Sequence, residues 1–229
     1  MIKIGVPLKY AHLKDGRCIL YLGERVRRTF QRAGAFIIPI VPVQDVDYMD
    51  THYLEFSELE DYEKEHIDAY LDMVDGVIFP GGYKITPYDQ YLLKRCVERN
   101  IPTLGICLGM QLMGSYPNDF KMEKNNTNID HFQEDDNLLT HKVSIKKGTL
   151  LYKILEEDEI LVNSFHNYHI EDCFDNTINA YSEDGLIEGV ERDDCKFYLG
   201  IQWHPEISYE FDLNSRKIID TFLKVCGNK

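Results

Sequence analysis

The chain has 229 residues, a formal net charge of −14 and an apolar content of 44%. This length and apolar content suit one sizeable α/β domain, residues 1–229, and the negative charge argues against nucleic acid and anionic membrane surfaces as partners. No apolar run approaches membrane-spanning length, and the chain leads directly into a predicted strand rather than a signal peptide. We therefore expect a cytoplasmic protein.

The first half of the chain alternates strands and helices. Apolar runs bounded by turn residues predict buried strands, and apolar residues three or four positions apart predict helices. The predicted strands are residues 2–6, 36–41 and 76–79, and the predicted helices are residues 21–33, 62–73 and 87–99. The alternation predicts an α/β fold with a mostly parallel, flavodoxin-like central sheet and helices on both faces.

An acidic segment, residues 45–75, interrupts this alternation and has Lys64 as its only Lys or Arg. Such a charge run usually forms a solvated surface. Its second half includes the predicted helix 62–73, and we expect its first half to be an exposed excursion.

The second half of the chain begins with a polar stretch, residues 115–140, whose weak apolar periodicity predicts a long loop. Short additional strands and a closing helix follow it. The strands are predicted at residues 142–145, 160–163, 178–181, 186–190 and 198–202, and the helix at residues 215–225.

Six scattered cysteines form no C-x-x-C pair, which indicates reduced thiols. One of them, Cys107, follows an apolar run, precedes a helical pattern and has Gly105 and Gly109 two residues to either side. This is a thiol version of the G-x-S-x-G nucleophile elbow, where a helix N-terminus favours the thiolate. A single cysteine is more often a small buried apolar residue, so other parts of the chain must decide.

His204 and Glu206 flank Pro205 at the end of the last predicted strand. A cysteine nucleophile needs a base, and the base needs an orienting group. A carboxylate bonded to one imidazole nitrogen would leave the other nitrogen for Cys107. The tripeptide alone is compatible with a surface turn, but its position after a strand, in a chain with a cysteine elbow, favours catalysis.

Two backbone N–H groups are candidates for stabilising an oxyanion. Leu108 follows the nucleophile, and Gly82 lies in the turn after the strand 76–79. Gly82 has no Cβ to obstruct a substrate, although an ordinary type II turn would explain the same residue. Because ligands bind at the carboxyl ends of parallel strands, we expect this turn and Cys107 to converge.

Three motifs in this order resemble those of the class I glutamine amidotransferase superfamily, and the likeness extends across nearly the whole chain. They are Pro80-Gly81-Gly82, Gly105-Ile106-Cys107-Leu108-Gly109-Met110-Gln111 and Trp203-His204-Pro205-Glu206. Residues 140–143, 162–166 and 182–188 are similar to the γ-glutamyl-γ-aminobutyrate hydrolase branch, as is the opening of the chain.

The resemblance implies hydrolysis of a small γ-glutamyl amide through a thioester on Cys107, with His204 and Glu206 completing a triad. It also implies that Gln111 and the backbone around Asn167 and Tyr168 hold the glutamyl group. Gln111 could instead be a helix residue packed by its amide.

We expect no cofactor, and the sequence is compatible with a homodimer. We also predict no metal site, because His166 and His169 have no carboxylate or thiolate partners at the expected spacing.

The chain departs from the hydrolase branch at Leu108, where the branch usually has arginine; leucine there is more typical of amidotransferases that supply ammonia. The alternatives are therefore a glutaminase subunit with a separate synthetase partner, or a non-catalytic binding protein. We interpret the acidic segment 45–75 and the loop 115–140 as borders of the leaving-group side, which would favour a neutral or cationic amine.

Overall fold

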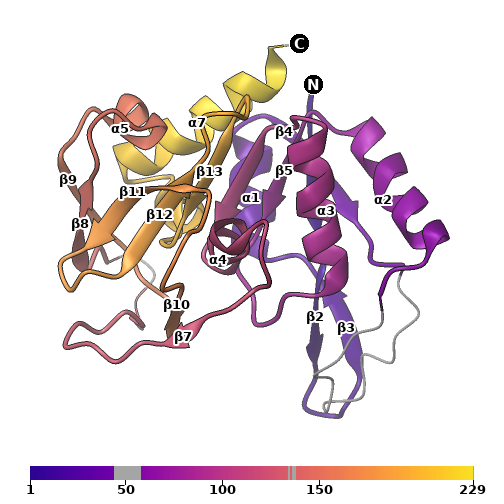
Figure 1. Ribbon diagram of the computed structural model, residues 1–229, viewed down its shortest axis with the longest axis horizontal. Coiled ribbons are helices and arrows are strands. Elements are labelled where there is room, and N and C mark those ends of the chain that lie inside the picture. Colours follow the sequence, from indigo (N-terminus) through magenta and orange to yellow (C-terminus); the bar gives the residue numbers. More distant parts are fainter. Residues whose placement is uncertain (44–57, 134, 136–137, 229) are drawn as a thin grey trace.

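The structure is a computed structural model that describes residues 1–43, 58–133, 135 and 138–228. Within these residues a nine-stranded sheet has the order β4-β1-β5-β6-β13-β12-β11-β8-β9 (Figure 1). Neighbouring strands are parallel from β4 to β13: β4 (Ala35–Ile40), β1 (Ile2–Pro7), β5 (Gly76–Phe79), β6 (Thr103–Ile106) and β13 (Tyr198–Ile201). The antiparallel part continues with β12 (Ile187–Glu191), β11 (Thr177–Ser182), β8 (His141–Ile145) and β9 (Glu159–Val162).

Helices cover both faces of the sheet. Successive residues of a strand point to opposite faces, so neighbouring residues pack into different cores. In β5, Ile78 belongs to the core beneath α1 (Glu24–Arg32), α5 (Leu150–Leu155) and α7 (Leu213–Gly227). Its neighbour Val77 belongs to the core beneath α2 (Asp61–Met73), α3 (Pro87–Glu98) and α4 (Leu108–Ser115). In the described part of the chain, no helix is both long enough and apolar enough to cross a membrane.

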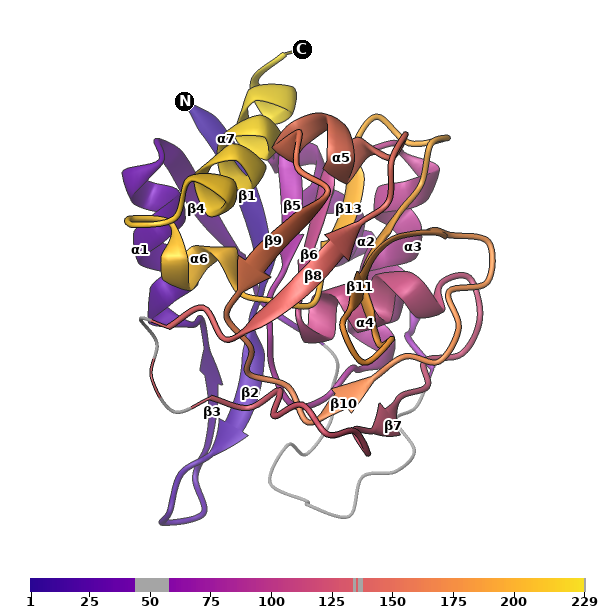
Figure 2. The same ribbon diagram turned by 90° about the vertical axis from the view of Figure 1, so that its left-hand side faces the viewer.

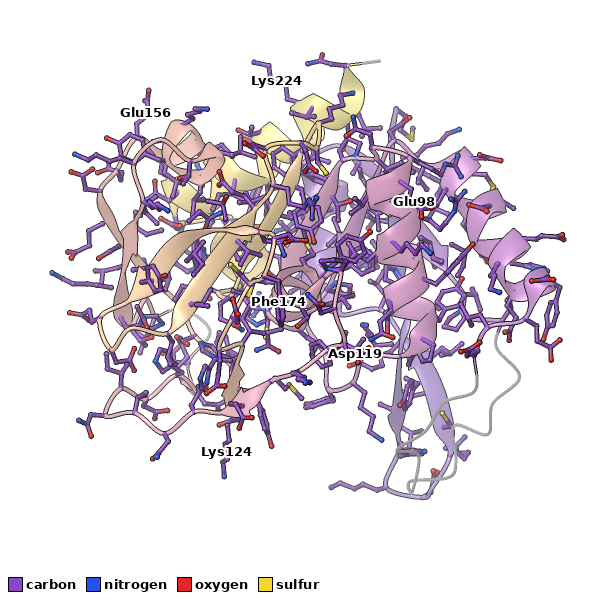
Figure 3. The ribbon with its side chains drawn as sticks, in the orientation of Figure 1. Glu98, Asp119, Lys124, Glu156, Phe174 and Lys224 are labelled. Carbon is purple, nitrogen blue, oxygen red and sulfur yellow. The ribbon has the colours of Figure 1, made fainter. Side chains whose placement is uncertain are left out.

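Two small strand pairs project from one end of the sheet, beyond the carboxyl ends of the parallel strands. They are β2 (Lys9–His12) with β3 (Cys18–Tyr21), and β7 (Glu123–Lys124) with β10 (Tyr168–His169). Figures 1 and 2 both show them at the edge opposite the two termini, where the parallel strands end. Figure 3 shows Lys124 of β7 pointing outward there.

The predicted mostly parallel sheet with helices on both faces is confirmed, and the short C-terminal strands extend the same sheet. The predicted helix 21–33 is wrong at its start, because Tyr21 ends β3 and the helix begins at Glu24. The β2–β3 hairpin, β7, β10, α5 and α6 (Pro205–Ser208) were not predicted, since such short elements carry little periodicity. The expected excursion in the first half of the acidic segment falls mainly on residues 44–57, outside the described residues.

We expect Gly109→Ala to lower the free energy of unfolding by at least about 2 kcal/mol. A Cβ there would overlap the carbonyl oxygen of Phe79 and lie 2.7 Å from its carbon, so backbone must move. Gly23→Ala is the matched control, because a Cβ at Gly23 would have nothing within 4 Å; it should cost less than about 1 kcal/mol. Urea unfolding of both variants measures the difference, and equal losses would contradict the close approach of α4 to β5.

Candidate active site

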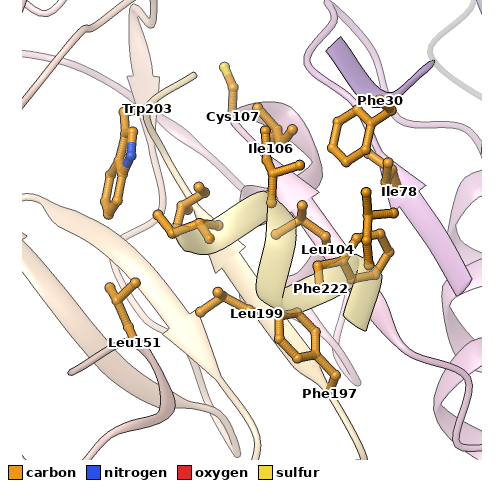
Figure 4. Packing of buried hydrophobic residues seen from close by; sticks show 14 of the residues in the cluster. Phe30, Ile78, Leu104, Ile106, Cys107, Leu151, Phe197, Leu199, Trp203 and Phe222 are labelled. Carbon is orange, nitrogen blue, oxygen red and sulfur yellow. The ribbon is translucent and has the colours of Figure 1, made fainter. Parts of the chain in front are cut away.

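Cys107 lies at the turn between β6 and α4 in a conformation that few L residues adopt, with φ 54° and ψ −109°. Such a conformation costs about 1–3 kcal/mol and persists only where the surroundings enforce it. The N–H of Cys107 donates to the carbonyl of Ile201 at 2.9 Å, and its own carbonyl accepts from the N–H of Gln111 at 3.1 Å. Figure 4 shows its sulfur pointing away from the packed side chains of Leu104 and Ile106.

Glycines allow this sharp turn because helix and sheet backbones approach closely. A Cβ on Gly105 would lie 2.8 Å from the carbonyl of Gly109, and one on Gly109 would overlap the end of β5. The chain therefore has to reverse within a single residue. That residue is Cys107, for which the sequence predicted an elbow from the apolar run before it, the glycines to either side and the helical pattern after it.

His204 and Glu206 form a hydrogen-bonded pair at the end of β13 and the start of α6. Nδ1 of His204 lies 2.7 Å from Oε1 of Glu206, and the carboxylate is buried. Asn163 fixes the backbone of His204 from both sides, since its amide donates to the His204 carbonyl at 2.8 Å and accepts from the His204 N–H at 2.8 Å. The ring of Phe165 meets the imidazole edge-on, with centroids 5.6 Å apart.

Cys107 and His204 both lie close to Gly81. A Cβ on Gly81 would lie 3.0 Å from Cε1 of His204 and 3.6 Å from Cβ of Cys107. Among the described residues, Nε2 of His204 has no hydrogen-bond partner. This nitrogen is therefore left for the thiol or for a bound substrate.

Opposing effects set the protonation of His204. Burial by itself disfavours the imidazolium, but Glu206 and then Cys107 favour it, so the pKa of His204 is raised well above its ordinary value. His204 therefore keeps its proton at neutral pH.

The two predicted oxyanion donors are brought together. Leu108 is the first residue of α4, so its N–H has no acceptor within the helix. A Cβ on Gly82 would lie 3.4 Å from Cδ2 of Leu108, which places the turn after β5 beside the start of α4.

Gln111 and Tyr168 are also brought together, but through a bond within the protein. The buried amide nitrogen of Gln111 donates to the Tyr168 carbonyl at 2.7 Å and to Gln202 Oε1 at 3.1 Å. Both amide protons are thus committed, and any bond from Gln111 to a ligand must come from its oxygen. The Asn167 carbonyl accepts a hydrogen bond from the N–H of Asn125, so the 115–140 loop lies against the segment of residues 163–168.

Sequence reasoning missed Lys9, a buried cation next to the site. Its Nζ lies 2.8 Å from Oδ1 of the buried Asp89, and its stem would contact a Cβ on Gly82 at 3.4 Å. Lys9 also lines a surface pocket of about 270 Å³ together with Gly81, His204 and Glu206. A lysine within a short hairpin strand carries no signal of such burial, so the sequence offered no means of finding it.

The described part of the acidic segment does not border this pocket. Asp68 and Asp72 of α2 pair with Arg95 of α3 and with Arg99, the residue that follows α3, and Asp68 Oδ1 lies 2.8 Å from Nε of Arg95. The residues around the pocket include Lys9, Glu24 and Arg25, which carry both signs of charge. The expected preference for a neutral or cationic amine therefore has no support from residues 58–75.

Four buried side chains, one of them in the segment 163–168, could hold a metal ion. They are His131, His141, His166 and Glu188, with one ligand atom from each lying within 4.8 Å of the others. The sequence predicted no metal at His166 and His169, because neither had partners at a local spacing. His169 lies outside the cluster and faces Asn125 at 3.1 Å, but His166 finds its partners on distant segments.

An α/β sheet with a strained cysteine at its carboxyl edge and a His–Glu pair beside it defines the class I glutamine amidotransferase-like hydrolases. The sequence profile of the Peptidase C26 family matches residues 88–206, about half of the chain. The chain belongs to this family.

Similar proteins agree with this class. The chain is 30% identical over 184 residues to the glutamine amidotransferase-like protein YvdE of Lactococcus lactis, covering 69% of this chain and 77% of YvdE. It is 30% identical over 213 residues to the CTP synthase of Thermosipho africanus, covering 77% of this chain but only 40% of that longer protein. The solved glutaminase domain of Trypanosoma brucei CTPS, with bound acivicin, shares the fold at a TM-score of 0.69 and 19% identity, over 100% of this chain and 95% of that one.

We expect the imidazole of His204 to stay protonated at pH 7, because Glu206 and then Cys107 outweigh the effect of burial and raise its pKa well above the ordinary value. Glu206→Gln removes the main group that raises this pKa, so the midpoint of the His204 titration should fall in that variant. NMR titration of the ring protons of His204 measures the midpoint in both proteins. A wild-type His204 that titrates near the ordinary histidine value of about 6.5 would contradict its pairing with Glu206.

Proposed function

We propose that this protein hydrolyses a γ-glutamyl amide through a thioester on Cys107, releasing glutamate and an amine. The observation that carries the proposal is the convergence at Gly81 of a strained Cys107 and of His204, whose other ring nitrogen is bonded to Glu206. Cys107 is the nucleophile, His204 the proton carrier, and Glu206 the group that orients the imidazole. This arrangement performs acyl transfer without a further cofactor.

Acylation begins when the Cys107 sulfur attacks the γ-carbonyl carbon and forms a C–S bond. The resulting oxyanion accepts hydrogen bonds from the backbone N–H groups of Leu108 and Gly82. The C–N bond then breaks as His204 gives its proton to the leaving amine. Glu206 keeps Nδ1 protonated, so that Nε2 is the nitrogen that faces the reaction.

Deacylation reverses the roles. His204 takes a proton from water as the water oxygen attacks the thioester carbon. The C–S bond breaks, the thiolate returns, and glutamate leaves. The glutamyl group lies toward the segment 163–168, where the Gln111 oxygen and the backbone near Asn167 and Tyr168 are the candidate contacts.

A second candidate is glutamine hydrolysis that supplies ammonia to a separate synthetase. Two observations favour it: the 30% identity to a CTP synthase, and leucine rather than arginine at position 108. Leu108 is buried against Gly82, so its side chain offers no charge to a leaving group. The hypothesis of a γ-glutamyl amine substrate rests instead on the likeness of residues 140–143, 162–166 and 182–188 to the γ-glutamyl-γ-aminobutyrate hydrolase branch.

We expect the three triad variants to lose activity in a graded manner. Cys107→Ser should fall below about 1% of the wild-type rate, since an alcohol is a far poorer nucleophile beside this histidine. His204→Ala should lose about a thousandfold, and Glu206→Gln should lose less, because the imidazole remains but is oriented less firmly. Steady-state kinetics and thermal unfolding of each variant separate catalysis from folding. A Cys107→Ser enzyme above about a tenth of the wild-type rate would exclude the thioester.

A substrate panel tests the proposal itself. We expect kcat/KM for at least one γ-glutamyl amine, among conjugates of γ-aminobutyrate and putrescine, to exceed that for glutamine at least about tenfold. Replacing the glutamyl group by glutaryl, which lacks the α-amino group, should cost at least about a hundredfold, because buried partners then remain unpaired. A tenfold preference for glutamine would favour the ammonia donor. If the protein hydrolysed none of these amides and Cys107 did not react with thiol reagents, the result would favour the non-catalytic binding protein.

A further inference from the structure

The cluster of His131, His141, His166 and Glu188 has the composition of a metal site. All four side chains are buried: the histidines are 3%, 3% and 4% exposed, and Glu188 is 0% exposed. They come from four segments: the 115–140 loop, β8, the segment 163–168 and β12. The rings pack closely, with the His131 centroid 4.7 Å from those of both His141 and His166.

In each histidine, one ring nitrogen lies against an oxygen acceptor outside the cluster. The pairs are His131 Nε2 with Asp184 Oδ2 at 2.9 Å, His141 Nδ1 with Lys142 O at 3.3 Å, and His166 Nδ1 with Tyr168 O at 3.0 Å. A carbonyl or carboxylate oxygen accepts a hydrogen bond, so the ring nitrogen facing it is the one that carries the proton and donates. The remaining nitrogen of each neutral ring then presents a lone pair. Metal-bound histidines are held by outer partners of this kind.

The remaining nitrogens gather around a carboxylate that has no donors. Among the described residues, neither oxygen of Glu188 nor Nε2 of His141 or His166 has a hydrogen-bond partner. Oε1 of Glu188 lies 3.4 Å from Nε2 of His166 and 3.7 Å from Nδ1 of His131. A buried carboxylate facing lone pairs is costly unless a cation lies among them.

A protonated histidine explains this arrangement less well than a metal ion. Hydrogen bonds between nitrogen and oxygen normally span about 2.7–3.2 Å, so 3.4 and 3.7 Å are long for an imidazolium bonded to Glu188. Ligand atoms that surround a zinc ion tetrahedrally lie about 2.0–2.1 Å from the ion and therefore about 3.4 Å from one another. The two separations from Glu188 are close to this ligand–ligand distance. One carboxylate with three neutral imidazoles carries one negative charge, which a divalent cation would more than compensate.

We propose that His131, His141, His166 and Glu188 bind one divalent transition-metal ion of the zinc type. Three nitrogen donors disfavour Mg²⁺ and Ca²⁺, which take oxygen ligands. Four protein ligands fill a tetrahedral site, so the ion is structural and leaves no position for substrate. This inference does not depend on the proposed function.

The bound ion would anchor the segment 163–168, which connects the cluster to the candidate active site. His166 lies three residues after Asn163, which clamps His204, and two residues before Tyr168, which bonds Gln111. On the loop side, Gln133 accepts from the N–H of Ser164 at 2.7 Å, two residues beyond His131. The metal would thus join this loop to the segment by a second, stronger connection.

Zinc titration of chelator-treated Cys107→Ser protein tests the proposal, because this background removes the thiolate that would bind zinc beside His204. Calorimetry should show one Zn²⁺ per chain. His141→Ala and Glu188→Gln should each weaken binding at least about a hundredfold. His169→Ala is the matched control, a neighbouring histidine outside the cluster, and it should leave the affinity within about threefold. Stoichiometric binding that His141→Ala and Glu188→Gln leave unchanged would overturn the proposal.

Two measurements on the unmutated cluster keep the test decisive if those variants fail to fold. Saturating Zn²⁺ should raise the Tm of the Cys107→Ser protein by about 5 °C or more. Co²⁺ should give the intense visible absorption of a four-coordinate site, and Zn²⁺ should displace it. A protein that binds neither ion and keeps the same Tm would overturn the proposal and indicate a buried ion pair between a protonated histidine and Glu188.

Discussion

The close packing of α4 against β5 and β6 is the constraint on which the candidate site depends. Gly105 and Gly109 let the backbones approach so closely that the chain must turn within one residue. Cys107 takes that strained conformation, and the turn aims its sulfur away from the core while placing Leu108 at the helix start. The strain is small beside the burial that the surrounding core provides, which is why the elbow can persist.

The segment 163–168 is the second organising feature, because it serves several parts of the molecule. Asn163 holds the backbone of His204, Phe165 packs on its ring, and the Tyr168 carbonyl occupies the amide of Gln111. A polar, partly irregular segment of this kind has little apolar burial of its own to fix it. Its attachment through His166 to a buried polar cluster therefore bears on the geometry of His204 as well as on that of Gln111.

The net charge of the chain does not indicate which charges surround the candidate site. The net charge of −14 describes association with distant partners, not the composition of a pocket. In the described residues Asp68 and Asp72 of α2 pair with Arg95 and Arg99, whereas the candidate site holds the buried pair of Lys9 and Asp89. The preference for a leaving group must consequently be sought in the pocket beside His204, where both signs of charge occur.

The amino-acid sequence by itself determined the features that depend on neighbouring residues. Alternating apolar runs and helical patterns predicted the parallel sheet, glycine spacing predicted the elbow at Cys107, and the His204–Glu206 spacing predicted their bond, because each is set by local backbone geometry. Only the tertiary structure decided what depends on long-range pairing. The ion pair of Lys9 with Asp89 joins a hairpin to a helix 80 residues away. The cluster of His131, His141, His166 and Glu188 forms because antiparallel strands and two loops converge, and no spacing along the chain records which side chains a sheet register will bring together.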